Sequence, residues 1–242
     1  MSTLLSTIET SARRHLNETT ASFWSSAEII DIVNQGIRDL WRDIVDLKQE
    51  HFLTFDTTNV SLAADTATIT GVPADVHKVY MIEPRDVSTT SANRNLHFEP
   101  LDYNHVRFQN ARSSSNIDPQ NGTIYYAIAG AGSPADDSGG ATSTRIYVAP
   151  KVSSAVTLQF VYVPTLAVRV AAQVNPIPGE SDNALIAWIV AFARAKERED
   201  RSPDPAWLAI YATEKNHLLQ SLGLRQYQEP TIVDGLYDAY WG

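Results

Sequence analysis

The most regular hydrophobic pattern of the chain lies near its N-terminus. Ser25 and Glu28 have the spacing of a capping box, and Trp24 before them can pack as a hydrophobic staple against Ile29. From residue 26 to 47, apolar side chains then recur every three or four positions: Ile29, Val33, Ile37, Leu40, Trp41, Ile44 and Leu47. This pattern predicts a helix of about six turns with one buried face. We expect its acidic residues to be solvated on the other face: Asp31, Asp39, Asp43 and Asp46.

A shorter helical pattern precedes this stripe. Over residues 3–16 the apolar positions have helical spacing and include Leu5, Ile8, Ala12 and Leu16. The pattern ends in the basic cluster Arg13, Arg14 and His15, and cations in a last turn complement the helix dipole. We therefore interpret this cluster as a helix end rather than as a nucleic-acid site.

The middle of the chain alternates apolar and polar residues and is rich in β-branched and aromatic side chains, as strands are. The predicted strands cover residues 52–62, 67–70, 76–83, 96–101, 123–128, 145–149 and 156–163. Prolines stand at strand edges, where a missing amide does least harm: Pro73, Pro84, Pro150 and Pro164. Residues 88–95 and 129–143 are rich in Ser, Thr, Gly and Ala, which predicts loops.

Helical patterns return near the C-terminus. Residues 184–193 are apolar on every side, so we expect this helix to be buried against several neighbours, in its own subunit or in the next one. Asp204 and Pro205 form an N-cap and first position for a second helix, and Gly223 is expected to end it. Its buried stripe comprises Trp207, Tyr211, Leu218 and Leu222.

These patterns together predict an α+β protein. We expect a helical bundle built from both chain ends, residues 1–50 and 165–223, with a long antiparallel β-rich insertion at residues 51–164. Residues 224–242 are expected to form an extended C-terminal tail.

Composition narrows the possible functions. The formal net charge is -9, which argues against a general grip on nucleic acid, because phosphate binding requires Lys and Arg. The chain has no cysteine, so disulfides and zinc-thiolate sites are excluded. The longest apolar run, residues 184–193, is half of the roughly 20 residues that a membrane span needs, and no signal peptide pattern is present. We expect no membrane association.

No pattern of residues indicates an enzyme. Residues 136–140 imitate the nucleophile loop of trypsin-like proteases around Ser138, but they lie in a predicted loop without the ordered flanks such a serine needs. Four clustered residues match no metal-binding motif: His97, Glu99, Asp102 and His105. Neither GxGxxG nor GxxxxGK[ST] occurs. We therefore predict no catalytic, metal or cofactor site.

The order of motifs resembles a known family. Residues 23–40, FWSSAEIIDIVNQGIRDL, resemble the opening "W-S-x-x-E-I-I-x-x-[IL]-N-x-A-[IL]-R-x-L" of tailed-phage head-to-tail adaptor proteins, with Gly36 in place of the usual Ala. Residues 121–126, 146–150 and 158–164 resemble their strands, although the first lacks the usual proline. The resemblance spans nearly the whole chain and extends to the tail tubular gatekeeper proteins of short-tailed phages.

This resemblance implies a structural virion protein at the head-tail junction, assembled in the host cytoplasm. Such adaptors form rings, typically of twelve subunits, that join the portal protein to a downstream tail or nozzle protein and let DNA pass without specific binding. A different tail-tube or nozzle component is the alternative. A carbohydrate- or receptor-binding β-module, suggested by Tyr125, Tyr126, Tyr147 and Tyr162, is a further alternative.

The tail at residues 224–242 is unusually aromatic for a chain end. A terminus without a partner is normally polar, whereas Tyr and Trp are the residues that anchor interfaces. We therefore predict that the tail docks on the portal or on a neighbouring subunit through its large apolar side chains: Tyr227, Ile232, Leu236, Tyr237, Tyr240 and Trp241.

Overall fold

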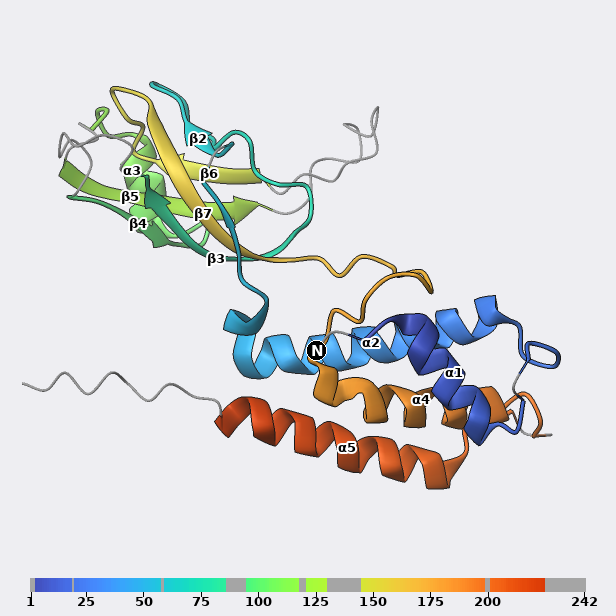
Figure 1. Cartoon of the computed structure of the whole chain (residues 1–242). Coiled ribbons are helices and arrows are strands. Elements are labelled where there is room, and N and C mark those ends of the chain that lie inside the picture. Colours follow the sequence, from blue (N-terminus) through green and yellow to red (C-terminus); the bar gives the residue numbers. More distant parts are fainter. Residues whose placement is uncertain are drawn as a thin grey trace, which may run out of the picture. The chain divides into compact units, whose positions relative to one another are not determined.

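The chain is a mixed α+β protein, as the sequence predicts. The computed structural model describes residues 3–18, 20–57, 59–85, 95–117, 121–129, 145–198 and 201–224, which contain five α-helices and two β-sheets (Figure 1). The chain divides into two compact units. One, here called the helical unit, comprises Met1–His51 and Leu166–Gly242, and the other, the β unit, comprises Phe52–Thr165.

The helical unit takes two helices from each of its chain segments. Its helices are α1 (Leu5–His15), α2 (Ser26–Lys48), α4 (Asp182–Arg194) and α5 (Pro205–Leu224). Helix α4 packs against the other three, and Figure 1 shows it lying between α2 and α5. None of its residues 184–193 is exposed. The neighbours that this all-apolar helix requires therefore come from its own chain.

The helix starts follow local sequence signals. Ser25 Oγ accepts a hydrogen bond from Glu28 N at 3.2 Å, and the Glu28 carboxylate accepts one from Ser25 N at 2.8 Å, so the predicted capping box of α2 is confirmed. Asp204 caps α5 by accepting a hydrogen bond from Ala206 N at 3.0 Å.

Two expectations about the helix ends are wrong. The buried stripe of α2 does not reach Leu47, which is 54% exposed, because the last buried positions are Ile44 and Val45. Gly223 lies inside α5, and its backbone does not take the left-handed conformation of a glycine that ends a helix.

Both sheets of the β unit are small. In the first, β7 (Val156–Pro164) pairs antiparallel with three other strands: β1 (Thr54–Asp56), β2 (Ser61–Leu62) and β3 (Val76–Pro84). The second has the order β4-β5-β6, with bounds Asn95–Pro100, Asn121–Ala129 and Arg145–Ala149. Strands β5 and β6 are antiparallel, but β4 and β5 are parallel.

The expected purely antiparallel insertion is therefore wrong for β4 and β5. Parallel neighbours need a crossover connection, and helix α3 (Val106–Arg112), which the sequence patterns missed, lies between these strands along the chain. The predicted strand over residues 52–62 is also wrong in part. The short helix η1 (Gln49–Phe52) occupies its start, and strands β1 and β2 are separate. Residues 67–70 form only isolated bridges.

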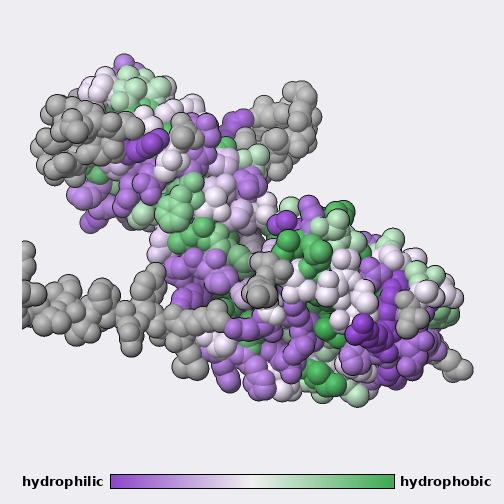
Figure 2. All heavy atoms as spheres, in the orientation of Figure 1, coloured by the Kyte–Doolittle hydropathy of each residue, from purple (hydrophilic) through white to green (hydrophobic). Residues whose placement is uncertain are grey.

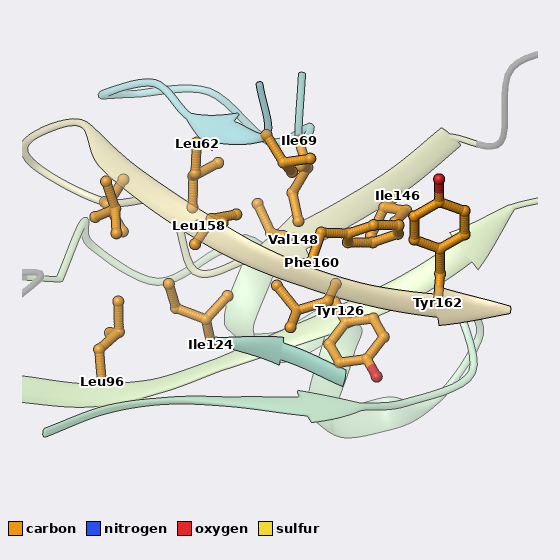
Figure 3. Close-up of a cluster of buried hydrophobic side chains, with 14 of the residues drawn as sticks. Leu62, Ile69, Leu96, Ile124, Tyr126, Ile146, Val148, Leu158, Phe160 and Tyr162 are labelled. Carbon is orange, nitrogen blue, oxygen red and sulfur yellow. The ribbon is translucent and has the colours of Figure 1, made fainter. Parts of the chain in front are cut away.

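The main core of the β unit is built by strand alternation. On β5 and β6, alternate side chains point to the same face of the sheet and join a large apolar cluster that also includes side chains of β7: Ile124, Tyr126, Ile146, Val148, Leu158 and Phe160. Figure 3 shows these side chains gathered between strands of the two sheets. The intervening side chains point to the opposite face, where Ala127 and Ala149 pack with Phe108 of α3 in a second, smaller cluster. Both faces of this sheet are thus covered.

Candidate assembly surfaces

The connection between α1 and α2 is built around a buried arginine. Arg13 is only 5% exposed, and its guanidinium contacts Glu9 at 2.9 Å and Glu18 at 3.3 Å. It also donates a hydrogen bond to the Trp24 carbonyl at 3.0 Å. The cluster lies in the last turn of α1, as predicted, and the charge of Arg13 is in addition paired inside the unit. Only Arg14 and His15 of that cluster are exposed.

Glu18 completes this connection. Burial raises the pKa of the Glu18 carboxyl, but hydrogen bonds from the backbone amides of Phe23, Ser22 and Trp24, together with the Arg13 charge, outweigh it and lower the pKa. The carboxylate thus stays ionised, and the hydrogen bonds that it accepts hold the short loop before α2 in place.

Three further polar contacts join segments that are far apart in sequence. Trp24 Nε1 donates to the Ala193 carbonyl at 2.9 Å, and Trp188 Nε1 donates to the Ile32 carbonyl at 3.1 Å. The Asn34 side chain donates to the Arg169 carbonyl and accepts from Arg169 N, both at 2.9 Å. Each contact fixes α2 or the residues next to it against the C-terminal half of the helical unit.

The acidic side of α2 is not simply solvated, contrary to expectation. Lys215 of α5 places its ammonium 2.7 Å from Asp39 and 2.5 Å from Asp43, and the Tyr211 hydroxyl donates to Asp39 at 2.5 Å. Burial raises the pKa of Asp39, but the hydrogen bonds from Lys215 and Tyr211 outweigh it, so the pKa is lowered. Asp31 and Asp46 remain exposed.

A cavity of about 430 Å³ lies in the helical unit where the start of α2 meets the end of α4. We call it the α2–α4 pocket. Its apolar lining consists of Trp24, Ile32, Phe192, Ala193 and Ala195, and its charged lining of Glu28, Asp31, Lys196 and Arg201. Figure 2 shows that hydrophobic residues are mixed among hydrophilic ones on the visible face of the molecule.

An ion pair joins the two helices beside this pocket. Lys196 Nζ lies 2.9 Å from Glu28 Oε1 and 4.9 Å from the centre of the Phe23 ring. The hydrogen bond from Lys196, followed by those from Ser25, lowers the pKa of Glu28 to about 2. The capping residue of α2 therefore also anchors the end of α4.

The β unit has a smaller cavity, of about 330 Å³, lined by Thr68, Ile69, Gly71, Val72, Arg145, Ile146 and Tyr147. The residues considered as metal ligands lie elsewhere. His97, Glu99 and Asp102 are exposed, and His105 caps α3 by accepting from Arg107 N at 3.2 Å. Across the described residues, no group of three or more His, Cys, Asp or Glu side chains is placed to hold a metal ion. Ser138 lies outside the described residues.

The four tyrosines that suggested a carbohydrate-binding surface do not form an exposed platform. Tyr126 and Tyr162 are buried in the main core of the β unit. Tyr125 and Tyr147 are half-buried and pack against the cluster beneath α3. These aromatic rings pack in the interior of the β unit, so they no longer support a carbohydrate-binding surface.

The predicted docking residues of the tail lie outside the described residues: Tyr227, Ile232, Leu236, Tyr237, Tyr240 and Trp241. The structure instead reveals the α2–α4 pocket, which sequence patterns missed because its lining comes from segments more than 150 residues apart. One local signal for the Arg13 connection was present, since Glu9 and Arg13 have the spacing of a helical ion pair.

No helix in the described part of the chain has the length and apolarity that crossing a membrane requires.

Comparison with known proteins identifies the family of the chain. A comparison with curated proteins finds no match. The family model of the SU10 adaptor protein matches residues 3–234, which is nearly the whole chain and includes both units. The chain therefore belongs to the SU10 adaptor protein family and is a structural adaptor protein of a phage virion.

Proposed function

We propose that the protein forms a ring of twelve copies that joins the portal protein to a downstream tail or nozzle protein. The ring forms part of the channel through which DNA leaves the head, and it is assembled in the host cytoplasm. The family match over residues 3–234 carries this proposal. Helix α4 does not support it, because the apolar sides of α4 are already covered within the chain. The ring must therefore close through other surfaces.

The charge of the chain suits a channel that does not retain DNA. Each copy contributes a formal net charge of -9, and a ring multiplies it. Arg13, Lys196 and Lys215 are each held in ion pairs with carboxylates. These cations are therefore engaged within the unit, whereas exposed carboxylates such as Asp31 and Asp46 face solvent. We propose a structural rather than a catalytic role, without cofactor or metal.

Cryo-electron microscopy of the intact particle tests the proposal. We expect density for this chain between portal and tail, with twelvefold symmetry and with both units fitting as described. Density within a tail tube or a distal nozzle would favour the alternative tail component. A trimeric fibre, or a single copy, at the junction would contradict the ring.

We also propose that the aromatic tail makes the docking contact, on the portal or on a neighbouring copy. Deleting Pro230 to Gly242 removes five of the six large apolar residues but none of the described core. The deletion variant should keep its helical circular dichroism signal and fail to join DNA-filled heads. Ile210→Ala, at an exposed residue of α5, is the matched control and should assemble normally. Particles completed normally by the deletion variant would contradict the docking role.

A further inference from the structure

We infer that residues 166–168, together with Leu53, form a hinge about which the β unit moves as one body relative to the helical unit. This inference goes beyond the proposed ring, because it concerns a single copy and holds whether or not copies assemble. In an assembled particle, such a hinge lets one unit stay fixed while the other follows the component that it contacts.

The chain passes between the two units at two places, after His51 and after Thr165. At the first crossing, Leu53 alone separates η1 from β1. The second crossing begins where β7 ends. Because β1 and β7 are paired antiparallel, the chain enters and leaves the β unit at neighbouring points. Bending at the two crossings therefore turns the β unit as a whole and leaves its strand pairing intact.

The second crossing is fixed at both of its ends. On the side of the β unit, Thr165 N donates a hydrogen bond to the Asp75 carbonyl. On the side of the helical unit, the buried side chain of Asn34 donates to the Arg169 carbonyl and accepts from Arg169 N, both at 2.9 Å. These two contacts confine the movable part of the crossing to residues 166–168.

Residues 166–168 are weakly held themselves. Within the described part of the chain they form no hydrogen bond. Ala167 is exposed, and Val168 is 67% exposed. Rotation of this backbone therefore breaks no hydrogen bond and uncovers little apolar surface. Hinges are such short segments, in which a few residues absorb the change in φ and ψ between two packed bodies.

The absence of cysteine allows pairs of spin labels to be placed in the full-length chain. Thr213→Cys in α5 and Asn110→Cys in α3, both at exposed positions, report distances between the units by double electron–electron resonance. Thr10→Cys with Thr213→Cys reports the helical unit alone, and Lys78→Cys with Asn110→Cys reports the β unit alone. The distance distribution between the units should be at least about twofold wider than either control, because the hinge displaces one whole unit.

An insertion locates the motion at the second crossing. Adding Gly-Ser-Gly-Ser between Ala167 and Val168 lengthens the free segment without replacing a packed residue. The distribution between the units should widen further, by about 1.5-fold, since the span of a flexible segment grows with the square root of its length. Both distributions within the units should stay unchanged, which also shows that the variant is folded.

A change at Asn34 tests the fixed end of the crossing. Asn34→Ala removes both hydrogen bonds to Arg169 and should also widen the distribution between the units. Gln35→Ala is the matched control, since it truncates an exposed amide at the next position of α2, and it should leave the distribution unchanged.

Two results overturn the inference. A distribution between the units that is no wider than the two controls would show that the chain is one rigid body. A wide distribution that the insertion leaves unchanged would place the motion outside residues 166–168. Either failure is distinguishable from failure of the proposed ring, because the labels are measured on the free chain and microscopy of the particle observes the ring directly.

Discussion

The helical unit and the β unit specify their structures by different means. In the helical unit, long-range polar contacts mark the joints between elements, such as Trp24 with Ala193, Asn34 with Arg169 and Lys215 with Asp39. In the β unit, the main core is an apolar cluster whose members follow from strand alternation and backbone pairing. Among the described members of this cluster, only Tyr126 and Tyr162 have a polar side-chain atom.

This difference follows from the geometry of the elements. Helices with apolar stripes can slide or rotate against each other at modest cost, so fixed polar partners define one arrangement. Strands are already registered by their ladder of backbone hydrogen bonds, and a slip by one residue would reverse every side chain. We therefore expect single changes to act on the helical unit mainly through polar joints, and on the β unit mainly through backbone geometry.

The chain carries its own probe for comparing the units. The sequence of the β unit, Phe52–Thr165, contains no tryptophan, and the described part of the helical unit contains Trp24, Trp41, Trp188 and Trp207. Tryptophan fluorescence therefore reports the unfolding of that unit alone. Amide hydrogen exchange of β5 and β7 reports the β unit.

The largest effect should come from removing the buried arginine of the helical unit. Arg13→Ala leaves Glu9 and Glu18 without the cation they share in a buried site. Breaking such a buried pair costs about 3–5 kcal/mol of unfolding free energy. The measurement is chemical denaturation followed by tryptophan fluorescence.

The neighbouring residue provides the control. Arg14→Ala removes the same charge one position later, from an exposed side chain, and should change stability by less than about 0.5 kcal/mol. Equal losses for the two variants would show that charge near the helix end, rather than the buried joint, stabilises the unit.

In the β unit, the corresponding weak point should be a backbone position. Gly71 has a φ of 75°, and a Cβ atom there would lie 1.9 Å from the Asn59 carbonyl oxygen. Gly71→Ala should therefore destabilise the β unit by roughly 3 kcal/mol, through left-handed strain and a clash with backbone. Hydrogen exchange should accelerate in β5 and β7. Protection that stays unchanged there would contradict the expected strain.

The sequence predicted features that depend on local spacing and missed those that depend on tertiary contacts. Elements set by local spacing were predicted well, such as the capping box at Ser25 and strand β6. Helix α3 was missed because only Phe108 and Ala111 of its seven residues are buried, which leaves no stripe to detect. The α2–α4 pocket depends on tertiary contacts across most of the chain, which no spacing records.

A smaller effect, and one that a second change can reverse, is expected at Gly36 of α2. A Cβ atom there would lie 2.8 Å from Trp188 Cδ1 and 3.0 Å from its Cγ. Overpacking costs about 1–3 kcal/mol, while exchanging Gly for Ala in a helix recovers up to about 1 kcal/mol. Gly36→Ala should therefore destabilise the helical unit by up to about 2 kcal/mol.

The double variant separates crowding from backbone effects. In a Trp188→Leu background, Gly36→Ala should become neutral or stabilising, because its two closest contacts are gone and the next, Leu185 Cδ2 at 3.2 Å, is the end of a flexible side chain. No comparable rescue is expected for Gly71→Ala, whose obstacle is a backbone carbonyl. A Gly36→Ala cost that persists without Trp188 would contradict this account of the position.

The smallest effect concerns the ion pair beside the α2–α4 pocket and appears only through its pH dependence. The hydrogen bond from Lys196 and those from Ser25 lower the pKa of Glu28 to about 2 from an ordinary value of 4.5. A carboxyl whose pKa is depressed by folding stabilises the fold above its unfolded pKa. That contribution is lost as the pH falls from about 4.5 towards 2.

Glu28→Gln should therefore lower the melting temperature slightly at neutral pH, with the difference from the parent chain shrinking through this range. Lys196→Met, which removes the largest cause of the shift, should reproduce the same pH profile, and the two changes together should cost little more than either alone. A difference that stays constant down to pH 2 would mean that Glu28 acts on the helical unit through its neutral hydrogen bonds and not through its charge.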